Sequence, residues 1–426
     1  MQISSIKNIS GSGKRLISNF FSLAVLQILN YLFPIITMPY LLRVIGAEKF
    51  GIIAIQTATF SYFQLLVDYG FNLSATKNIS VNRDDKNKVS EIFSSVMTIK
   101  CGLLAVSLII MVILINVITA FRDYQTIYYI AFIGLIGNAF FPVWFFQGIE
   151  RMKYITYFNF FSRLAFTVLI FIVIKVENDY FKVVLLNSIA SIIIGIVSVW
   201  IVVVNFRVKY MIPRFSVLKG YFLEGWYIFI STFSVNMYIN SNTLILRAFT
   251  NDTVVGYYSM AEKIITAVRS LASVIFQAIY PYVCSKALES KEKLKDFYRK
   301  VFIPAVIVFL SGCLILLVFS GLIIRLMAGE QVIESEVILK ILSFVPFIVV
   351  SNIPAYQTML AYDFKKSYTS VLFTGSVLNI ILNLVLVNMF SSYGTAVSVL
   401  ITELYITVGL YIVLELKHPK YSLFRS

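Results

Sequence analysis

The chain has 426 residues, of which 59% are hydrophobic, 15% aromatic and 13% charged, and its formal net charge is +15. Soluble domains carry about 25% charged residues, so this composition excludes a globular protein with a polar surface. Lys and Arg stand in short clusters between apolar runs, which is typical of cytoplasmic loops and argues against a nucleic-acid-binding protein. The three cysteines lie in or beside apolar runs, which predicts small buried side chains rather than disulfides or zinc ligands. The composition therefore predicts an integral membrane protein.

Apolar runs of membrane-spanning length follow one another along the whole chain. A helix needs about 20 apolar residues to cross the hydrocarbon core, so we expect an all-α integral membrane fold with about twelve transmembrane helices. The first run is too long for a cleaved signal peptide and is taken as the first span. The predicted spans are residues 17–41, 51–72, 91–120, 124–147, 154–174, 181–204, 221–246, 254–283, 301–327, 336–361, 368–389 and 393–415.

The distribution of Lys and Arg predicts the orientation of these spans. Alternate connections, together with both ends of the chain, carry 24 of these residues, whereas the opposite connections carry 7. Because basic residues stay on the cytoplasmic side, we expect both termini in the cytoplasm. The segment "GIERMK" (148–153) is then a tight cytoplasmic turn between the fourth and fifth spans.

Five basic residues fall inside predicted spans. A charge at the centre of a bilayer costs about 2.5–3.5 kcal/mol on insertion scales, so these side chains are expected to line a polar interior instead of facing lipid. They are Lys100, Arg163, Lys263, Arg269 and Lys340.

An internal repeat with an offset of 205 residues aligns Gly51 with Gly256 and superposes two polar helix faces. We therefore predict two pseudo-symmetric six-helix bundles, residues 1–210 and 211–426, with the polar faces opposed across a central cavity. The alternative is that the uncharged polar residues only hold neighbouring helices together. The first face holds Thr57, Ser61, Gln64 and Asp68, and the second holds Glu262, Thr266, Arg269, Ser273 and Gln277.

Several segments resemble signature sequences of one transporter family. The segments "PYLLRVIGAEKFG" (39–51), "DYGFNLSATKNIS" (68–80) and "PVWFFQGIERMKYIT" (142–156) are similar to those of bacterial O-antigen and polysaccharide transporters, as are "GYYSMAEKI" (256–264), "QAIYP" (277–281) and "LNIILNLVLV" (378–387). These transporters belong to the multidrug/oligosaccharidyl-lipid/polysaccharide exporter superfamily.

The resemblance implies two six-helix bundles around a central cavity, without an ATPase. It also implies a flippase that moves undecaprenyl-pyrophosphate-linked repeat units from the cytoplasmic to the periplasmic leaflet of the bacterial inner membrane, for lipopolysaccharide biosynthesis. The cavity of such a flippase is expected to be cationic. Possible partners are an O-antigen polymerase and a chain-length regulator. Among the charged residues, Arg43 and Asp68 lie inside matching segments.

The polar residues within the spans suit a lipid-linked sugar. Its phosphates need cationic partners and its hydroxyls need hydrogen bonds, because neither can cross hydrocarbon unsatisfied. We expect Arg269, Lys100, Arg163 and Lys263 to bind the pyrophosphate or acidic sugars, and the two polar faces to bind hydroxyls. The alternative for each basic residue is an ion pair with one of four acids, since charges inside a membrane commonly pair. These acids are Asp68, Glu224, Glu262 and Glu403.

No cofactor or metal is predicted, and nothing in the chain is expected to hydrolyse nucleotide. The segment "GSGK" (11–14) lacks the Gly and Ser or Thr positions of a phosphate-binding loop. Uphill transport would therefore need a proton or sodium gradient, and the same four acids are candidate ion carriers. The single histidine, His418, is expected to be solvated in the C-terminal tail.

Two other functions are compatible with such a chain. A multidrug exporter of the same superfamily would favour an acidic cavity, whereas the charges within the spans here lean towards basic. An O-antigen polymerase would present a long periplasmic loop, but all predicted connections on that side are short. The prediction is thus a transporter and not an enzyme.

Overall fold

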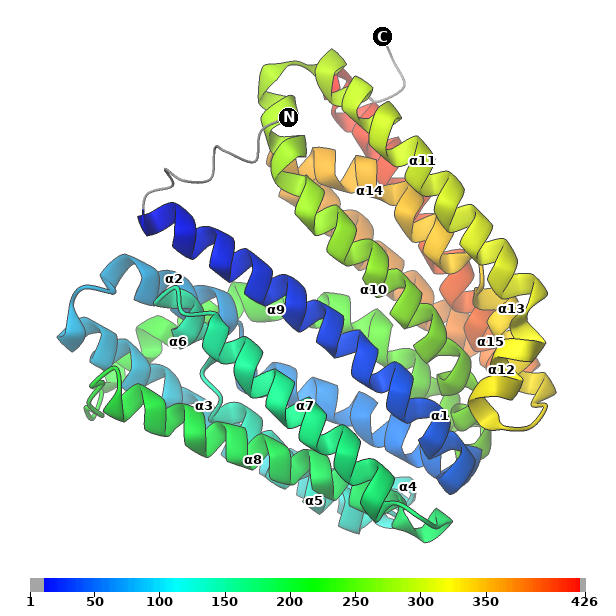
Figure 1. The fold of residues 1–426 in the computed structure, drawn as a ribbon, viewed down its shortest axis with the longest axis horizontal. Helices are drawn as coiled ribbons and strands as arrows, with labels where there is room; N and C mark the ends of the chain where they lie inside the picture. Colours follow the sequence, from blue (N-terminus) through cyan, green and yellow to red (C-terminus); the bar gives the residue numbers. More distant parts are fainter. Residues whose placement is uncertain (1–10, 422–426) are drawn as a thin grey trace. The chain divides into compact units, whose positions relative to one another are not determined.

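The computed structural model of the protein describes the backbone of residues 11–421 and most side chains from Phe33 onward (Figure 1). All regular structure in this part of the chain is helical, which confirms the all-α part of the predicted fold class. Eight helical segments among the described residues are long and apolar enough to cross a membrane, so the protein is an all-helical, multi-pass membrane protein. They are Phe33–Asn82, Lys86–Val117, Gln125–Gly148, Lys153–Val173, Glu177–Val204, Lys291–Val318, Ile333–Ala361 and Lys365–Lys417.

The helices follow the predicted spans closely, and many of the breaks between them contain Pro, Gly or polar residues. Helices α9 and α10 coincide with the predicted spans 221–246 and 254–283, although they are not among the eight segments above. The α-helices are α1 Gly11–Asp68, α2 Phe71–Asn82, α3 Lys86–Val117, α4 Thr119–Arg122, α5 Gln125–Ala139, α6 Val143–Gly148, α7 Lys153–Val173, α8 Tyr180–Val204, α9 Phe215–Phe249, α10 Asp252–Glu289, α11 Lys291–Val318, α12 Ser320–Ala328, α13 Ile333–Leu342, α14 Val345–Ala361 and α15 Lys365–Lys417. Two short 3₁₀ helices are η2 Glu177–Asp179 and η3 Pro419–Tyr421.

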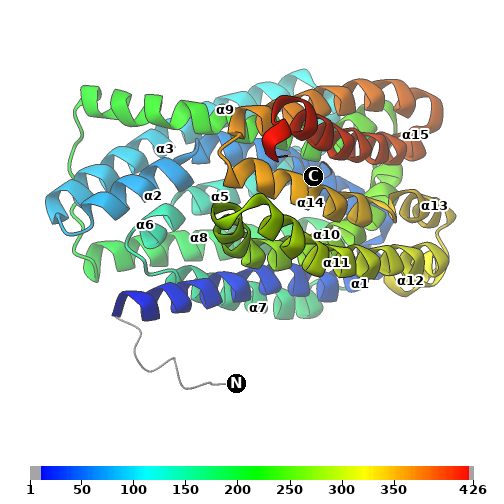
Figure 2. The ribbon, with the colours of Figure 1, turned by 90° about the horizontal axis from the view of Figure 1, so that it is seen from above.

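The two longest helices each contain one non-helical residue that divides them. In α15 this residue is Ser391, with a φ of 54°. Asn379 Nδ2 donates to Thr402 Oγ1 at 3.2 Å across this point, so the helix folds back into two antiparallel limbs, which lie side by side in Figure 2. In α1 the interruption is Gly46, whose φ of 73° is readily adopted only by glycine. Each of the two long helices therefore consists of two limbs, and their count as separate membrane spans stays a prediction.

Contacts divide the chain into two compact units. Unit 1 comprises the residues up to Thr37 and Thr59–Phe233, and unit 2 comprises Met38–Ala58 and the residues from Ser234 onward. The borders of these units fall inside α1 and α9 rather than in loops. The predicted division into repeats 1–210 and 211–426 concerns internal symmetry and stays a prediction.

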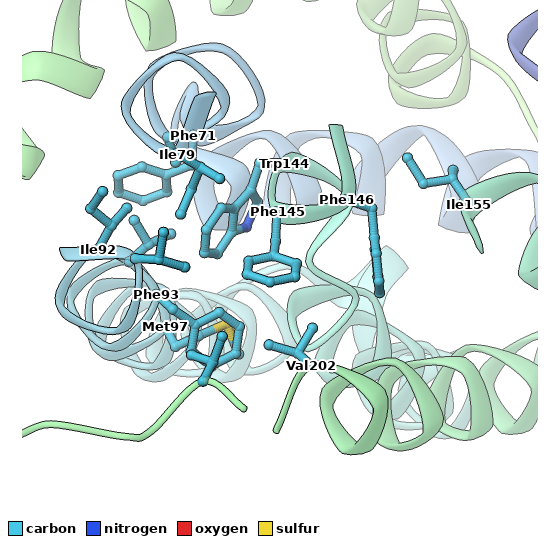
Figure 3. Packing of buried hydrophobic residues seen from close by; sticks show 14 of the residues in the cluster. Phe71, Ile79, Ile92, Phe93, Met97, Trp144, Phe145, Phe146, Ile155 and Val202 are labelled. Atoms are coloured by element: carbon cyan, nitrogen blue, oxygen red, sulfur yellow. The ribbon is translucent and has the colours of Figure 1, made fainter. Parts of the chain in front are cut away.

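The core of unit 1 is built around the aromatic segment of α6. Trp144, Phe145 and Phe146 are 0%, 1% and 0% exposed, and the Trp144 ring lies 5.8 Å from that of Phe93 on α3 (Figure 3). Helix α2 closes this cluster, because Phe71, Ala75 and Ile79 recur every fourth residue and are all buried. The predicted spans end at residue 72 and resume at residue 91, so most of α2 was not predicted, because this helix is short and adjoins charged residues.

The turn between α6 and α7 occupies the predicted segment. Glu150 has a φ of 58°, and the Arg151 N–H donates to the Phe146 carbonyl at 2.8 Å. Glu150 Oε1 also pairs with Arg83 Nη1 at 2.8 Å, which joins the turn to the end of α2. The tight turn is thus confirmed, whereas its cytoplasmic location stays a prediction.

In unit 2, the two glycines aligned by the internal repeat lie against each other. A Cβ added to Gly51 would overlap the carbonyl oxygen of Asp252, and one added to Gly256 would overlap that of Ala47. Glycine at both positions allows the second limb of α1 and the start of α10 to cross with their backbones in contact. This close crossing brings the two predicted polar helix faces together at one end.

Candidate functional site

A charged cluster in unit 1 is centred on Asp68, the last residue of α1. Lys100 Nζ lies 3.0 Å from Asp68 Oδ1, and Gln64 Nε2 donates to Oδ2 at 2.8 Å, so both carboxylate oxygens are satisfied. The Lys100 side chain is only 2% exposed, whereas that of Asp68 is 24% exposed. The accessible member of this pair is therefore the carboxylate.

A second ion pair lies within unit 2, between α10 and the second limb of α15. Arg269 Nη2 lies 2.7 Å from Glu403 Oε1. Here the polarity is reversed, because the Glu403 side chain is 3% exposed and that of Arg269 is 29% exposed. A guanidinium has five N–H donors in a planar fork, so the accessible side of this pair is a cationic hydrogen-bond donor.

This second pair lies in the wall of a cavity of about 200 Å³. The cavity is formed by α10, α14 and both limbs of α15, and it combines apolar walls with convergent polar groups, as small-molecule sites do. The rings of Tyr356 and Tyr368 are 5.8 Å apart in its wall. The polar lining residues are Arg269, Ser273, Asn352, Tyr356, Tyr368 and Glu403.

A smaller cavity of about 80 Å³ lies in unit 2 near the crossing of the two glycines. Thr57 from α1 faces Glu262 and Lys263 from α10 across it. Glu262 Oε1 accepts a hydrogen bond from Thr266 at 2.8 Å, and Lys263 is exposed. The first members of the two predicted polar faces thus line one polar cavity. The remaining polar lining comes from Asn240, Thr243, Tyr258 and Ser259.

The other predicted residues occupy different environments. Arg163 is on α7, and its Nε is buried without a hydrogen-bond partner among the described residues. Glu224 is exposed on α9 and accepts a hydrogen bond from Asn78 at 2.8 Å. Ser61 is half-buried in unit 1, and the side chain of Gln277 lies outside the described residues. The structure therefore gathers Lys100 with Asp68 and Gln64, and Arg269 with Ser273 and Glu403. Arg163, Glu224 and Ser61 belong to neither of these groups.

Not every basic residue predicted to lie within a span lines a cavity. Lys340 on α13 is 44% exposed and pairs with Glu336 one turn earlier, at 2.7 Å. Its long side chain reaches a neighbour on its own helix, which requires no polar interior. Lys340 thus lines neither cavity of unit 2, and a lumen-facing position for it stays a prediction.

His418 was expected to be solvated and is instead packed. Its ring stacks on Phe364 with centroids 3.6 Å apart and an angle of 6°, and its Nε2 lies 3.1 Å from the Ser367 hydroxyl. Burial lowers the pKa of the imidazole, and the adjacent Lys417 lowers it further. The short helix η3 folds the tail back over α15, which explains the difference.

Some polar residues of unit 2 were not predicted. Asn383 Nδ2 donates to Asn242 Oδ1 at 2.9 Å and its Oδ1 accepts from Thr395 at 3.0 Å, within a fully buried network. The i, i+4 spacing of Asn379 and Asn383 in an apolar run was the available signal. The described part of the chain contains no group of three or more His, Cys, Asp or Glu residues that could hold a metal ion.

Residues 16–287 match the sequence profile of the family described as polysaccharide biosynthesis protein. This match covers well over half of the chain. The chain belongs to this family. A relative from Escherichia coli (strain K12) is 31% identical over 390 residues, which cover 91% of this chain and 94% of the relative. One from Shigella dysenteriae is 27% identical over 89% of this chain and 95% of its own length. Both bear the name "Putative O-antigen transporter".

Solved structures agree with this family at the level of the fold. An inward-facing multidrug resistance MATE family transporter of the MOP superfamily matches with a TM-score of 0.69 at 13% identity, over 91% of this chain and 96% of its own. The lipid II flippase MurJ, in an inward closed conformation, matches with a TM-score of 0.68 at 13% identity, over 94% of this chain and 87% of its own. The relatives and these neighbours are named as transporters and not as enzymes, in agreement with the sequence prediction.

Proposed function

We propose that the protein is an O-antigen transporter that flips undecaprenyl-pyrophosphate-linked repeat units between the leaflets of the bacterial inner membrane. The observation that carries the proposal is the polar and aromatic cavity at Arg269, whose accessible guanidinium suits an anionic sugar or phosphate. The names of the two relatives support the same assignment. The function contributes to lipopolysaccharide biosynthesis.

The architecture that we propose has twelve crossings in two six-helix bundles around a central cavity, with both termini in the cytoplasm. The breaks at Gly46 and Ser391 support this number, because each long helix then supplies two crossings. Transport would proceed by alternating access of the cavity to the two sides of the membrane. An O-antigen polymerase and a chain-length regulator are the expected partners.

The burial of each side chain supports a division of roles among the predicted residues. Arg269 and Lys263 are the basic residues that reach the cavities of unit 2, so we assign them to anionic substrate groups. Tyr356 and Asn352 would bind sugar rings and hydroxyls beside Arg269. Lys100 is buried against Asp68, and its role would be to hold that carboxylate in place.

Coupling to a proton or sodium gradient is part of the same proposal. Asp68 and Glu262 are the acids that keep partial access among the four candidates, whereas Glu403 is buried in its ion pair and Glu224 is exposed beside Asn78. A flux assay in vesicles with imposed gradients would test this point. Flux that responds to neither gradient would remove ion coupling from all four acids.

Complementation tests the proposed function directly. The chromosomal O-antigen flippase of a suitable host is deleted, and this chain is supplied with its repeat-unit genes. We expect long-chain surface polysaccharide to return and lipid-linked units to stop accumulating inside the cell. The variant Lys340→Met serves as a control and should restore the polysaccharide equally well. It removes a basic residue within a predicted span, but this residue lines neither cavity of unit 2. Normal membrane expression without restored polysaccharide would contradict the proposal.

A second candidate function is export of cationic drugs. It is favoured by the accessible Asp68 carboxylate in unit 1, which would suit a cation. Efflux of a cationic dye by cells that express the chain, lost in Asp68→Asn, would support it. Equal dye retention with and without the chain would exclude it.

A further inference from the structure

A long apolar groove lies on unit 1 between α7 and α8, which run side by side in Figure 1. Its volume is about 530 Å³, and its lining is almost entirely apolar or aromatic. Its lining includes the small side chains of Ser162, Ala165 and Ala190 among larger apolar ones. The lining residues are Tyr154, Tyr157, Phe158, Phe161, Ser162, Ala165, Phe166, Leu169, Leu186, Ile189, Ala190, Ile193, Ile194, Val197 and Ile201.

The groove extends along most of the length of α7 and α8. On α7 its lining runs from Tyr154 to Leu169, and on the antiparallel α8 it runs from Leu186 to Ile201. At 1.5 Å per residue each stretch is about 22 Å long, out of a hydrocarbon core of about 30 Å. An occupant would therefore lie along the helices and would be apolar over most of the thickness of the hydrocarbon core.

One end of the groove is strongly basic. Tyr154 and Ile201 mark this end. The basic residues just beyond them are Arg151 and Lys153 at the start of α7, and Arg207 and Lys209 after α8. All four are exposed. The nearby acid Glu150 is already paired with Arg83.

The opposite end of the groove has mixed charge. There, Lys182 pairs with Asp179, and Lys175 and Glu177 precede them. The groove therefore suits an amphiphile whose anionic head lies at one end only. A diphosphate carries more negative charge and more acceptor oxygens than the phosphodiester of an ordinary lipid, so it can pair with more of the four basic residues.

We propose that this groove binds the polyprenyl chain of a diphosphate-linked substrate, with the diphosphate at the basic end. This inference rests on the proposed function and adds to it a site for the lipid part, separate from the cavities for the sugar. The groove would orient the carrier lipid while the glycan enters the protein.

Photocrosslinking tests the inference on the full chain in vesicles of phosphatidylethanolamine and phosphatidylglycerol. p-Benzoylphenylalanine is placed at Phe161, which lines the groove and is 63% exposed, or at Ile196 on α8, which is not among the lining residues and is 65% exposed. The probe is radiolabelled undecaprenyl diphosphate. We expect strong labelling at position 161 and background labelling at 196.

Filling the groove and neutralising its basic end give two further tests. Ala190→Phe, or Ala165→Phe from the facing helix, should abolish selective labelling at position 161. Arg151→Gln with Arg207→Gln should raise the half-saturating concentration of the diphosphate about fivefold for each charge removed, and should not affect undecaprenol. Size-exclusion profiles identify any variant that fails to fold.

Two outcomes would overturn the inference. One is equal labelling at positions 161 and 196, and the other is loss of labelling when the phosphatidylglycerol content is raised, which would make the groove a general lipid contact. Labelling does not require transport, so the two proposals fail separately. Selective labelling with failed complementation would reject the flippase, and restored polysaccharide with unselective labelling would reject the groove site.

Discussion

Removing the arginine from the ion pair in unit 2, whose glutamate is buried, should destabilise the protein far more than removing both members. The single variant is Arg269→Met, which leaves the Glu403 carboxylate without its cation. The double variant adds Glu403→Leu and replaces the pair by apolar side chains of similar size. The matched control is Lys340→Met, which breaks a pair of the same 2.7 Å N–O distance with the lysine 44% exposed.

The magnitudes follow from distance and burial. At 2.7 Å, the attraction between Arg269 and Glu403 is about 6 kcal/mol at an effective dielectric constant of 20. Desolvation of the two groups offsets most of this, so the double variant should be within about 1 kcal/mol of the parent or more stable. The single variant leaves a carboxylate that is 3% exposed and should cost about 3–5 kcal/mol. Lys340→Met should cost less than about 1 kcal/mol.

The assay has to report on unit 2, and the three tryptophans, Trp144, Trp200 and Trp226, all lie in unit 1. Cys313 lies in unit 2 and is 1% exposed, so its reaction with a thiol-reactive fluorogenic dye follows the unfolding of that unit. Cys101→Ala and Cys284→Ala remove the other thiols. Thermal unfolding is recorded for the parent and for each variant, and a double-mutant cycle gives the coupling energy.

One pattern of results would refute this reasoning. If Arg269→Met and the double variant lost the same stability, the unpaired carboxylate would not be the source of the loss. If the double variant were stable and still restored surface polysaccharide, Arg269 would be a structural residue and not a substrate-binding one.

Three further predictions concern packing and pH. Gly256→Ala should cost about 1–3 kcal/mol because its Cβ overlaps a backbone carbonyl, whereas Gly102→Ala in open space should be neutral or stabilising, both by thermal unfolding. Trp144→Ala should cost about 3–5 kcal/mol by far-UV circular dichroism, and Trp200→Ala, on an exposed face, less than about 0.5 kcal/mol. The single imidazole of His418 should titrate by NMR with a pKa below about 6.5, because burial and Lys417 lower it. The packing of the ring is then complete above about pH 6.5 and is lost as the pH falls through this lowered pKa. A midpoint at or above about 6.5 would show that the ring is solvated.

The membrane helices were predictable because the length of an apolar run is enough to indicate a membrane-spanning helix. The predicted spans 154–174 and 181–204 differ by a residue or less from α7 and α8. Helix α2 was missed for the same reason, since a 12-residue helix that buries one face against protein leaves no long apolar run. Its burial depends on α6, which is distant in sequence.

The site was predictable only as a set of residue types. The cost of a charge within a span indicated that Lys100 and Arg269 needed partners. Which partner each one meets depends on packing between helices, because Lys100 is 32 residues from Asp68 and Arg269 is 134 residues from Glu403. Which member of each pair stays accessible is likewise a property of the tertiary structure.

The buried aromatic segment of α6 has a consequence for how substrate specificity can change within this family. The run "WFFQGIERM" supplies the core and the following turn of unit 1, and its three leading side chains are at most 1% exposed. A chain can therefore keep this run unchanged while it acquires a different sugar specificity. Under the proposed function, the sugar specificity is better sought by comparing the residues around Arg269 across strains of different serotype than by matching the run "WFFQGIERM" itself.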